Sequence, residues 1–324
     1  MRRKTMIGLA IVLILILVAV FWLTQPLFFP PRVEIAGDAV DPERLEIHVR
    51  RLSEDFHKRN FANRENLLAT ADYIKSELEK AGGAVSEQNF SDDGNNYTNV
   101  IARFGAETGE KIIIGAHYDS AFDTPGADDN ASGVAGLIEL GHLFGKNPPG
   151  MQIELVAYTL EEPPFFATEK MGSYVHAESL ENEPSGVRLM VCLEMIGYFS
   201  DAPDSQDFPT SVMKLLYPGK GDFIAIVGNF TNGLTVRRFK GLMAKSGDLP
   251  VYSINAPAFI PGIDFSDHRN YWKFGHDAVM ITDTSFYRNP NYHTVDDTAE
   301  KLDYARMAQV VRAVYNAVVV YSRN

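Results

Sequence analysis

The chain has 324 residues and a formal net charge of −12, with 42 acidic side chains against 30 lysines and arginines. This negative charge argues against nucleic-acid binding, because nucleic-acid phosphates attract basic surfaces. A single cysteine, Cys192, excludes an internal disulfide. A hydrophobic content of 45% predicts a large folded core rather than disorder.

Three basic residues at positions 2–4 precede an uncharged apolar run over residues 6–23. As a helix this run would be about 27 Å long, close to the roughly 30 Å of a bilayer's hydrocarbon core. We expect residues 1–5 to form a cytoplasmic basic tip and residues 6–23 a transmembrane signal anchor. The rest of the chain would then lie on the extracytoplasmic side, in the periplasm or at the cell exterior. The alternative is a cleaved signal peptide and a secreted protein, but no small-residue cleavage site follows Leu23.

Residues 24–40 are rich in proline and lack periodicity, which predicts a linker, and residues 41–324 are predicted to form one domain. Residues 41–82 show a helical pattern that stops at Gly82 and Gly83. The following strands are predicted over residues 97–104, 111–116, 152–160, 187–196, 222–227, 251–254 and 278–282. The helices between and after them are predicted over residues 131–144, 168–180, 234–245 and 301–322.

This alternation predicts an α/β fold with a mixed, mostly parallel central sheet and helices on both faces. The strand over residues 111–116 contains three consecutive isoleucines, which is typical of a strand buried on both faces. In such folds the functional site lies beyond the carboxyl ends of the strands. We therefore looked for reactive side chains where the predicted strands end.

Acidic and histidine side chains are found at these strand ends. They are His117 and Asp119, Asp129, Glu161 and Glu162, Glu194, and His293. Carboxylates that gather at one edge of a sheet repel one another and lose hydration, so a positive partner is expected. Lysine and arginine are scarce near these positions, and carboxylate plus imidazole are the ligands that zinc prefers. The pattern therefore predicts a metal site.

The same residues belong to an ordered set of short motifs. In chain order these are His117-Tyr-Asp119, Asp129-Asn130, Glu161-Glu162, Glu194-Met-Ile-Gly197, Ser266-Asp267-His268 and Tyr292-His293-Thr294. The set resembles the zinc aminopeptidases and their glutamate carboxypeptidase relatives, which hold two co-catalytic metals on an α/β sheet. The resemblance covers roughly residues 45–324 and implies a zinc exopeptidase-like fold for the domain.

The resemblance implies two zinc ions per chain. His117, Glu194 and Asp129 would hold the first ion, while Asp129, Glu162 and His293 would hold the second. Asp129 would thus bridge the two ions, with a water molecule between them. Relatives usually carry aspartate in place of Glu194; the longer side chain offers the same ligand atoms but places the strand end slightly further back.

The resemblance also assigns roles to residues that bind no metal. Glu161 would be the general base that takes a proton from the attacking water. Tyr292 would stabilise the oxyanion. Asp119 would hydrogen-bond the far nitrogen of His117, and Ser266 would support Glu194 in the same way. The peptide bond Asp129–Asn130 is a candidate for the cis geometry seen in the family.

Other carboxylates near strand ends are expected to be ordinary solvated or helix-capping residues. These are Asp123, Asp128, Asp283, Asp296 and Asp297. The prolines at positions 163 and 164, where relatives often have a small residue, are expected to reshape the pocket wall. Residues 200–221, with several acids and prolines, are expected to form the pocket rim.

The expected function is that of a metal-dependent exopeptidase acting on peptides, with an aminopeptidase as the first expectation. A carboxypeptidase or dipeptidase remains an alternative, since Arg269 and Arg288 could bind a terminal carboxylate. A one-zinc glutaminyl cyclase is a further alternative on the same scaffold, although such enzymes lack ligands that this chain has. A non-catalytic ectodomain is the most distant alternative, because the base and all five ligands are present.

Overall fold

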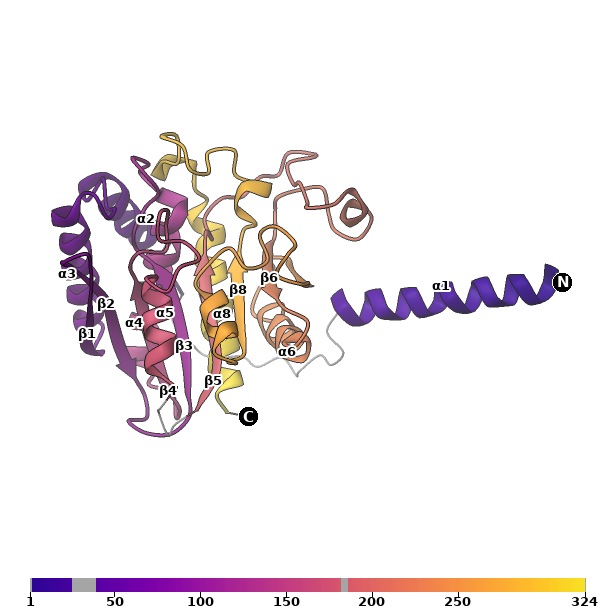
Figure 1. Cartoon of the computed structure of the whole chain (residues 1–324), viewed down its shortest axis with the longest axis horizontal. Coiled ribbons are helices and arrows are strands. Elements are labelled where there is room, and N and C mark those ends of the chain that lie inside the picture. Colours follow the sequence, from indigo (N-terminus) through magenta and orange to yellow (C-terminus); the bar gives the residue numbers. More distant parts are fainter. Residues whose placement is uncertain (1, 25–38, 182–185, 324) are drawn as a thin grey trace.

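The computed structural model describes residues 2–24, 39–181 and 186–323 (Figure 1). In this part of the chain the strands form one eight-stranded sheet in the order β1-β2-β4-β3-β5-β8-β6-β7. The strands are β1 (Ala84–Asp92), β2 (Asn95–Phe104), β3 (Lys111–His117), β4 (Gln152–Tyr158), β5 (Val187–Glu194), β6 (Ile224–Gly228), β7 (Val251–Asn255) and β8 (Ala278–Thr282). The predicted α/β fold with a mixed sheet is confirmed.

The middle of the sheet is parallel: β3 pairs with β4 and β5, and β5 pairs with β8. The two edges break this pattern, because β1 and β2 are antiparallel to their neighbours and β6 is antiparallel to β8. The carboxyl ends of β4, β3, β5 and β8 therefore meet at one edge of the sheet. As predicted, β3 is buried along its whole length.

Helices cover both faces of the sheet (Figure 1). The larger hydrophobic core joins one face to α2 (Pro42–Arg50), α3 (Arg64–Lys80), α4 (Gly133–Lys146), α6 (Gly233–Met243) and α8 (Tyr304–Tyr321). A smaller core joins the other face to α5 (Gly172–Ser179) and α7 (His268–Lys273). Strand β3 contributes to both cores, since Ile112 and Ile114 pack in the larger one and Ile113 in the smaller one.

Two parts of the fold differ from the sequence-based expectation. The helical pattern over residues 41–82 is divided between α2, a π-helical segment η1 (Arg51–Asp55) and α3. The break lies where Asn60 forms a turn, accepting hydrogen bonds from the backbone amides of Ala62 and Asn63 at 3.1 Å each. Strand β1 was not predicted, because it is a partly exposed edge strand with polar residues and no apolar alternation.

The N-terminal helix α1 (Arg2–Thr24) covers the apolar run and projects from the rest of the molecule (Figure 1). Among the described residues, no helix was found that is both long and apolar enough to cross a membrane. The predicted transmembrane helix over residues 6–23 is therefore not supported here. Most of the predicted linker, residues 25–38, lies outside the described residues.

Candidate metal centre

The predicted site residues meet at the shared carboxyl edge of the parallel strands. His117 is the last residue of β3 and Glu194 the last residue of β5. Glu161 and Glu162 follow β4, and His293 lies in the loop after β8. Asp129 lies in the kinked segment η2 (Ala127–Ser132), directly before α4, and its own φ of −104° and ψ of 92° are not helical.

Besides a group formed by His117, Glu161 and Glu162, these side chains form two overlapping groups that share Asp129, and the ligand atoms within each group lie within 4.8 Å of one another. In the first, His117 Nε2 is 3.3 Å from Asp129 Oδ1 and 3.3 Å from Glu194 Oε2. In the second, His293 Nε2 is 3.1 Å from Asp129 Oδ2 and 3.3 Å from Glu162 Oε2. Each oxygen of Asp129 thus faces a different histidine, so this carboxylate joins the two groups.

The backbone around Asp129 is held from two directions. The Asp129–Asn130 peptide bond is cis, as predicted. The carboxylate of Asp297 accepts hydrogen bonds from the backbone amides of Asp128 and Asp129 at 3.0 and 3.1 Å. The side chain of Asn130 accepts from the amide of Met195 at 3.0 Å, directly after Glu194. This amide side chain couples the position of Asp129 to the end of β5.

Glu161 and Glu162 both reach the site although they are adjacent in the chain. The backbone leaves the strand geometry at Leu160, whose φ of +59° is left-handed. The amides of Glu161 and Glu162 then donate to the two carboxylate oxygens of Asp119, at 3.1 and 3.0 Å. Asp119 therefore holds this turn so that both glutamate side chains join the cluster.

The hydrogen bond predicted between Asp119 and His117 is made by a different atom. His117 Nδ1 donates to the backbone carbonyl of Asp119 at 3.1 Å, whereas the nearer carboxylate oxygen of Asp119 is 3.6 Å away. The carboxylate is already occupied by the two glutamate amides. The carbonyl nevertheless has the expected effect, because it fixes the proton on Nδ1 and leaves the Nε2 lone pair facing Asp129 and Glu194.

Glu194 has the supporting contact that was predicted for it. Ser266 Oγ donates to Glu194 Oε2 at 2.5 Å. The next residue, Met195, has a φ of +48°, so the chain turns sharply as soon as β5 has delivered the glutamate. The longer glutamate side chain thus reaches His117 from the strand end itself.

Burial and mutual repulsion disturb the titration of the whole cluster. Burial raises the pKa of Glu161 well above its usual range, and Glu162 and Glu194 add to the effect. Burial and the charge of Asp129 raise the pKa of Glu162 to about 7. Burial alone would lower the pKa of His293, but Asp129 and Glu162 outweigh it and raise this pKa to about 10. Without a further cation, burial and repulsion therefore oppose the ionisation of Glu161 and Glu162.

Three carboxylates that were expected to be solvated are in fact buried. Asp128 and Asp283 have no exposed surface, and Asp297 is 1% exposed. They accept backbone hydrogen bonds that shape the loops: Asp128 from Gly197 at 3.0 Å and Asp283 from Tyr198 at 2.9 Å. The other two members of that group, at positions 123 and 296, are exposed as predicted.

Sequence analysis also missed a buried cation near the site. Arg59 has no exposed surface and donates to the backbone carbonyls of Tyr118, Pro125 and Gly126. Burial lowers its pKa to about 10, so it stays protonated at neutral pH. It holds the loop between His117 and Asp129, and no sequence motif signals this role.

The residues of the cluster fit a pair of metal ions. The Oε1 atom of Glu162 is buried and has no hydrogen-bond partner among the described residues. Two imidazole nitrogens converge with carboxylate oxygens, and this donor set suits zinc. Dications would also provide the positive charge that the buried carboxylates require.

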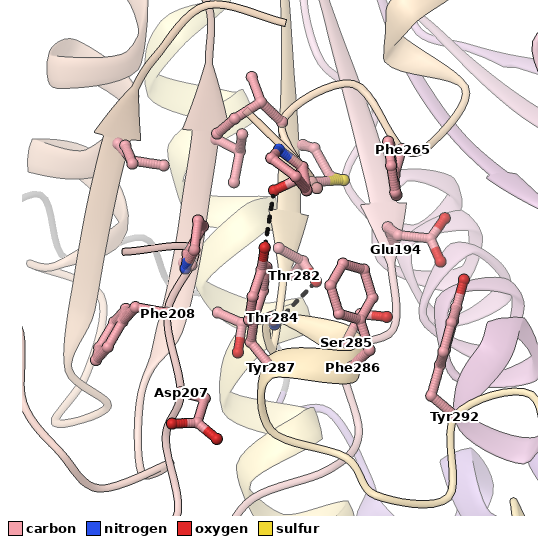
Figure 2. Close-up of a pocket in the computed structure, with 18 of the residues that line it drawn as sticks. Glu194, Asp207, Phe208, Phe265, Thr282, Thr284, Ser285, Phe286, Tyr287 and Tyr292 are labelled. Carbon is pink, nitrogen blue, oxygen red and sulfur yellow. Dashed lines mark hydrogen bonds between the residues drawn. The ribbon is translucent and has the colours of Figure 1, made fainter. Parts of the chain in front are cut away.

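A cavity of about 230 Å³, open to solvent, adjoins the cluster. Figure 2 shows Glu194 and Tyr292 at one side of it, Asp207 and Phe208 at the opposite side, and Phe286 between them. As predicted, residues 200–221 form part of its rim and contribute Gln206, Phe208 and Tyr217 among others. Most of the remaining lining is apolar.

Tyr292 lines this cavity beside the cluster. Its ring stacks on that of His293, with centroids 3.8 Å apart and an interplanar angle of 17°. Burial raises the pKa of Tyr292, and the nearby carboxylates, first Asp129, add to the effect. The hydroxyl therefore remains protonated and can donate a hydrogen bond.

The two arginines that could have bound a substrate carboxylate do not line the cavity. Arg288 is 6% exposed and donates to the backbone carbonyl of Phe223 at 2.8 Å and to Gln206 at 2.9 Å. Arg269 pairs with Asp264 at 3.3 Å. Among the described residues that line the cavity there is no lysine or arginine.

The sequence model of one peptidase family, Peptidase family M28, matches residues 99–318, about two thirds of the chain. The chain belongs to peptidase family M28. This confirms the resemblance to zinc aminopeptidases. The matched region begins in β2 and ends in α8, so it contains every residue of the two metal-ligand groups.

Individual proteins are similar to this chain in sequence or in fold. The chain is 48% identical to the uncharacterised protein YfbL of Escherichia coli over 315 residues, covering 94% of this chain and 97% of that protein. The LapA aminopeptidase of Legionella pneumophila has a similar fold, with a TM-score of 0.69, 20% identity and coverage of 87% and 72% of the two chains. A glutaminyl cyclase of Bacteroides thetaiotaomicron has a TM-score of 0.65 at 18% identity, with coverage of 87% and 99%.

Proposed function

We propose that this M28 protein is a two-zinc aminopeptidase that hydrolyses the first peptide bond of a free N-terminus. The main support for this proposal is the arrangement of side chains around Asp129. Its two oxygens face His117 and His293, at 3.3 and 3.1 Å, with one further carboxylate in each group. Glu161 lies beside both groups, 3.9 Å from His117 Nε2, and is needed by neither as a ligand.

His117, Asp129 and Glu194 would hold one zinc ion, and Asp129, Glu162 and His293 the other. Bound zinc would polarise the scissile carbonyl and lower the pKa of the attacking water. Glu161 then takes the proton from this water as it attacks and passes it to the leaving amine. Its burial beside His117 and the ligand carboxylates places this carboxylate where it can accept and return a proton.

Tyr292 is proposed to donate a hydrogen bond to the oxyanion that develops on the carbonyl oxygen. The stacked ring of His293 fixes the orientation of the tyrosine ring. Its hydroxyl is protonated because burial raises its pKa, and the surrounding carboxylates add to this effect. A fixed donor of this kind stabilises the transition state more than the substrate.

The charge of the cavity favours an N-terminal amine over a C-terminal carboxylate. Carboxylates line it at Glu161, Glu162 and Asp207, while no lysine or arginine is found among the described lining residues. With zinc bound, the charge of Glu162 is taken up by the metal, but Glu161 and Asp207 can still attract an ammonium group, whereas no cationic side chain among the described lining residues could pair with a substrate carboxylate. The apolar lining further favours a large, uncharged first side chain.

The deciding experiment is a hydrolysis screen on zinc-loaded protein with one peptide in free, N-acetylated and C-amidated forms. We expect cleavage of the free and amidated peptides, release of the first residue, and no cleavage of the acetylated peptide. Cleavage that survives acetylation but not amidation would identify a carboxypeptidase instead. A peptide beginning with glutamine tests the cyclase alternative, because cyclisation releases ammonia without shortening the peptide.

A further inference from the structure

Phe122, in the loop between β3 and η2, has two unusual features. Its side chain is 60% exposed, and its φ of +47° is in the left-handed region. Both features are unfavourable for an aromatic residue, because the ring faces water and Cβ crowds the backbone. Such outliers are found at functional sites more often than elsewhere.

The loop holds Phe122 in a fixed position. The side-chain amide of Asn60 donates to the carbonyl of Phe122. The next residue, Asp123, pairs with Lys58 at 2.6 Å, and its carbonyl is 2.9 Å from His57 Nε2. These contacts come from the segment between η1 and α3, so the exposed ring is presented on a supported loop.

The ring lies against the most exposed member of the metal cluster. The rings of Phe122 and His293 are 6.1 Å apart at an angle of 88°. The His293 side chain is 23% exposed, whereas that of Glu194 is 8% exposed and that of Asp129 is 5% exposed. Phe122 is not part of the cavity lining, in contrast to His293 and Tyr292.

The next step rests on the proposed aminopeptidase function. Phe122 lies outside the cavity lining, so the cavity and Phe122 can contact different halves of a substrate. The first residue is placed in the cavity, because this cavity adjoins the cluster and offers space for its side chain. The carbonyl carbon must face Glu161, so the remainder of the peptide leaves toward solvent. The exposed edge of the cluster is at His293, and there the peptide meets Phe122.

We propose that Phe122 binds the side chain that follows the scissile bond and makes the enzyme favour a large apolar or aromatic residue at that position. Aromatic rings gain from contact with other apolar side chains beyond the area that they bury. A small residue such as glycine makes no such contact. Phe122 is thus a specificity residue for the leaving half of the substrate.

The test compares three substrates that share the first residue: Leu-NH2, Leu-Gly-NH2 and Leu-Phe-NH2. Each is assayed with zinc-loaded wild type, Phe122→Ala, Phe122→Tyr and the control Phe259→Ala. Phe259 is 80% exposed and also lies outside the cavity lining, so it matches the substitution. Zinc content per chain is measured for every variant.

We expect wild type to prefer Leu-Phe-NH2 over Leu-Gly-NH2 in kcat/KM. In Phe122→Ala this preference should fall roughly 3- to 10-fold, the range for loss of one aromatic contact. Phe122→Tyr and Phe259→Ala should retain it. Zinc content should remain at the wild-type value in all of them.

Two results would overturn the inference while leaving the aminopeptidase function intact. One is an unchanged preference in Phe122→Ala. The other is an equal loss on all three substrates together with lost zinc, which would show that Phe122 only supports His293. If wild type cleaves none of the three substrates, the proposed function itself is wrong and this inference falls with it.

Discussion

Glu161 and Glu162 are neighbours in sequence, but their side chains face different partners. Glu162 Oε2 lies 3.3 Å from His293 Nε2, within one of the two ligand groups. Glu161 has only a 3.9 Å contact to His117 Nε2 and lies between the groups. The same chemical group can therefore serve as a ligand at one position and as a base at the next, because the Leu160 turn directs each differently.

The substitution Glu161→Gln tests the proposed role of Glu161 as the general base. The amide keeps the size of the side chain but cannot accept the proton, so the rate should fall about 10²- to 10⁴-fold. Zinc content should remain at two ions per chain, as measured by atomic absorption. Glu178→Gln, at an exposed position on α5, is the matched control. Near-wild-type activity in Glu161→Gln would remove this residue from the mechanism.

The second ligand group is tested by His293→Ala. This change removes the only nitrogen ligand of the group formed with Asp129 and Glu162, so zinc content should fall toward one ion per chain. Activity should be lost, and excess zinc in the assay should restore part of it at best. His276→Ala, in the loop before β8, is the control. Two tightly held ions in His293→Ala would contradict the assignment.

At the scale of elements, the segment η2 is the part of the site that depends most on distant residues. It connects the Arg59-bound loop to α4 and carries Asp129. Its first amides are capped by Asp297, which is 168 residues away in sequence from Asp129. The close approach of α4 to β5 also requires a glycine, because a Cβ at Gly133 would lie 2.8 Å from the carbonyl oxygen of Leu193.

The substitution Asp297→Asn tests whether the Asp297 carboxylate holds the first backbone amides of η2. Asparagine has a single acceptor oxygen, so one of the two backbone amides of Asp128 and Asp129 loses its partner and faces an NH2 group. We expect a loss of about 1–3 kcal/mol in the free energy of unfolding, measured by urea titration of the zinc-free protein. Zinc affinity should also fall.

The neighbouring substitution Asp296→Asn provides the control, because Asp296 is exposed and only its backbone is hydrogen-bonded. It should change stability by less than about 0.5 kcal/mol. Equal effects of the two substitutions would show that Asp297 does not hold η2.

At the scale of the whole molecule, the parallel middle of the sheet decides where the site lies. Four neighbouring strands end at one edge, and the loops that follow three of them carry ligands. The antiparallel edge strands β6 and β7 instead form the floor of the cavity, to which Ala225, Val227 and Ile254 contribute. The metal cluster and the apolar cavity thus occupy adjoining parts of one sheet.

Localisation stays a prediction from the sequence, and we propose the membrane anchor on that basis alone. In α1 the apolar side chains are exposed, as with Met6 at 70% and Leu9 at 67%. Deleting residues 1–24 should therefore leave the melting temperature and zinc content of the domain unchanged. The full chain should sediment with membranes after cell lysis and the truncated chain should not. A full chain found only in the soluble fraction would contradict the anchor.

The sequence was sufficient to find two of the proposed ligands because each of them ends a recognisable strand. An apolar run marks the strand before His117 and before Glu194, and a polar residue directly after such a run is conspicuous. It was insufficient for the edge strand β1, whose residues are polar and half exposed. It also misjudged Asp297, since an aspartate in a loop has the same local signature whether it is solvated or buried.

The sequence by itself determined which carboxylates and histidines are available, and that they lie at the ends of predicted strands or in the loops that follow them. Local patterns suffice for this because strand burial and strand ends are properties of short segments. Only the tertiary structure decided which atoms meet: the Asp119 carboxylate with two glutamate amides, Asp297 with η2, and Phe122 with His293. These contacts join segments far apart in the chain, and the packing of the loops on the sheet brings them together.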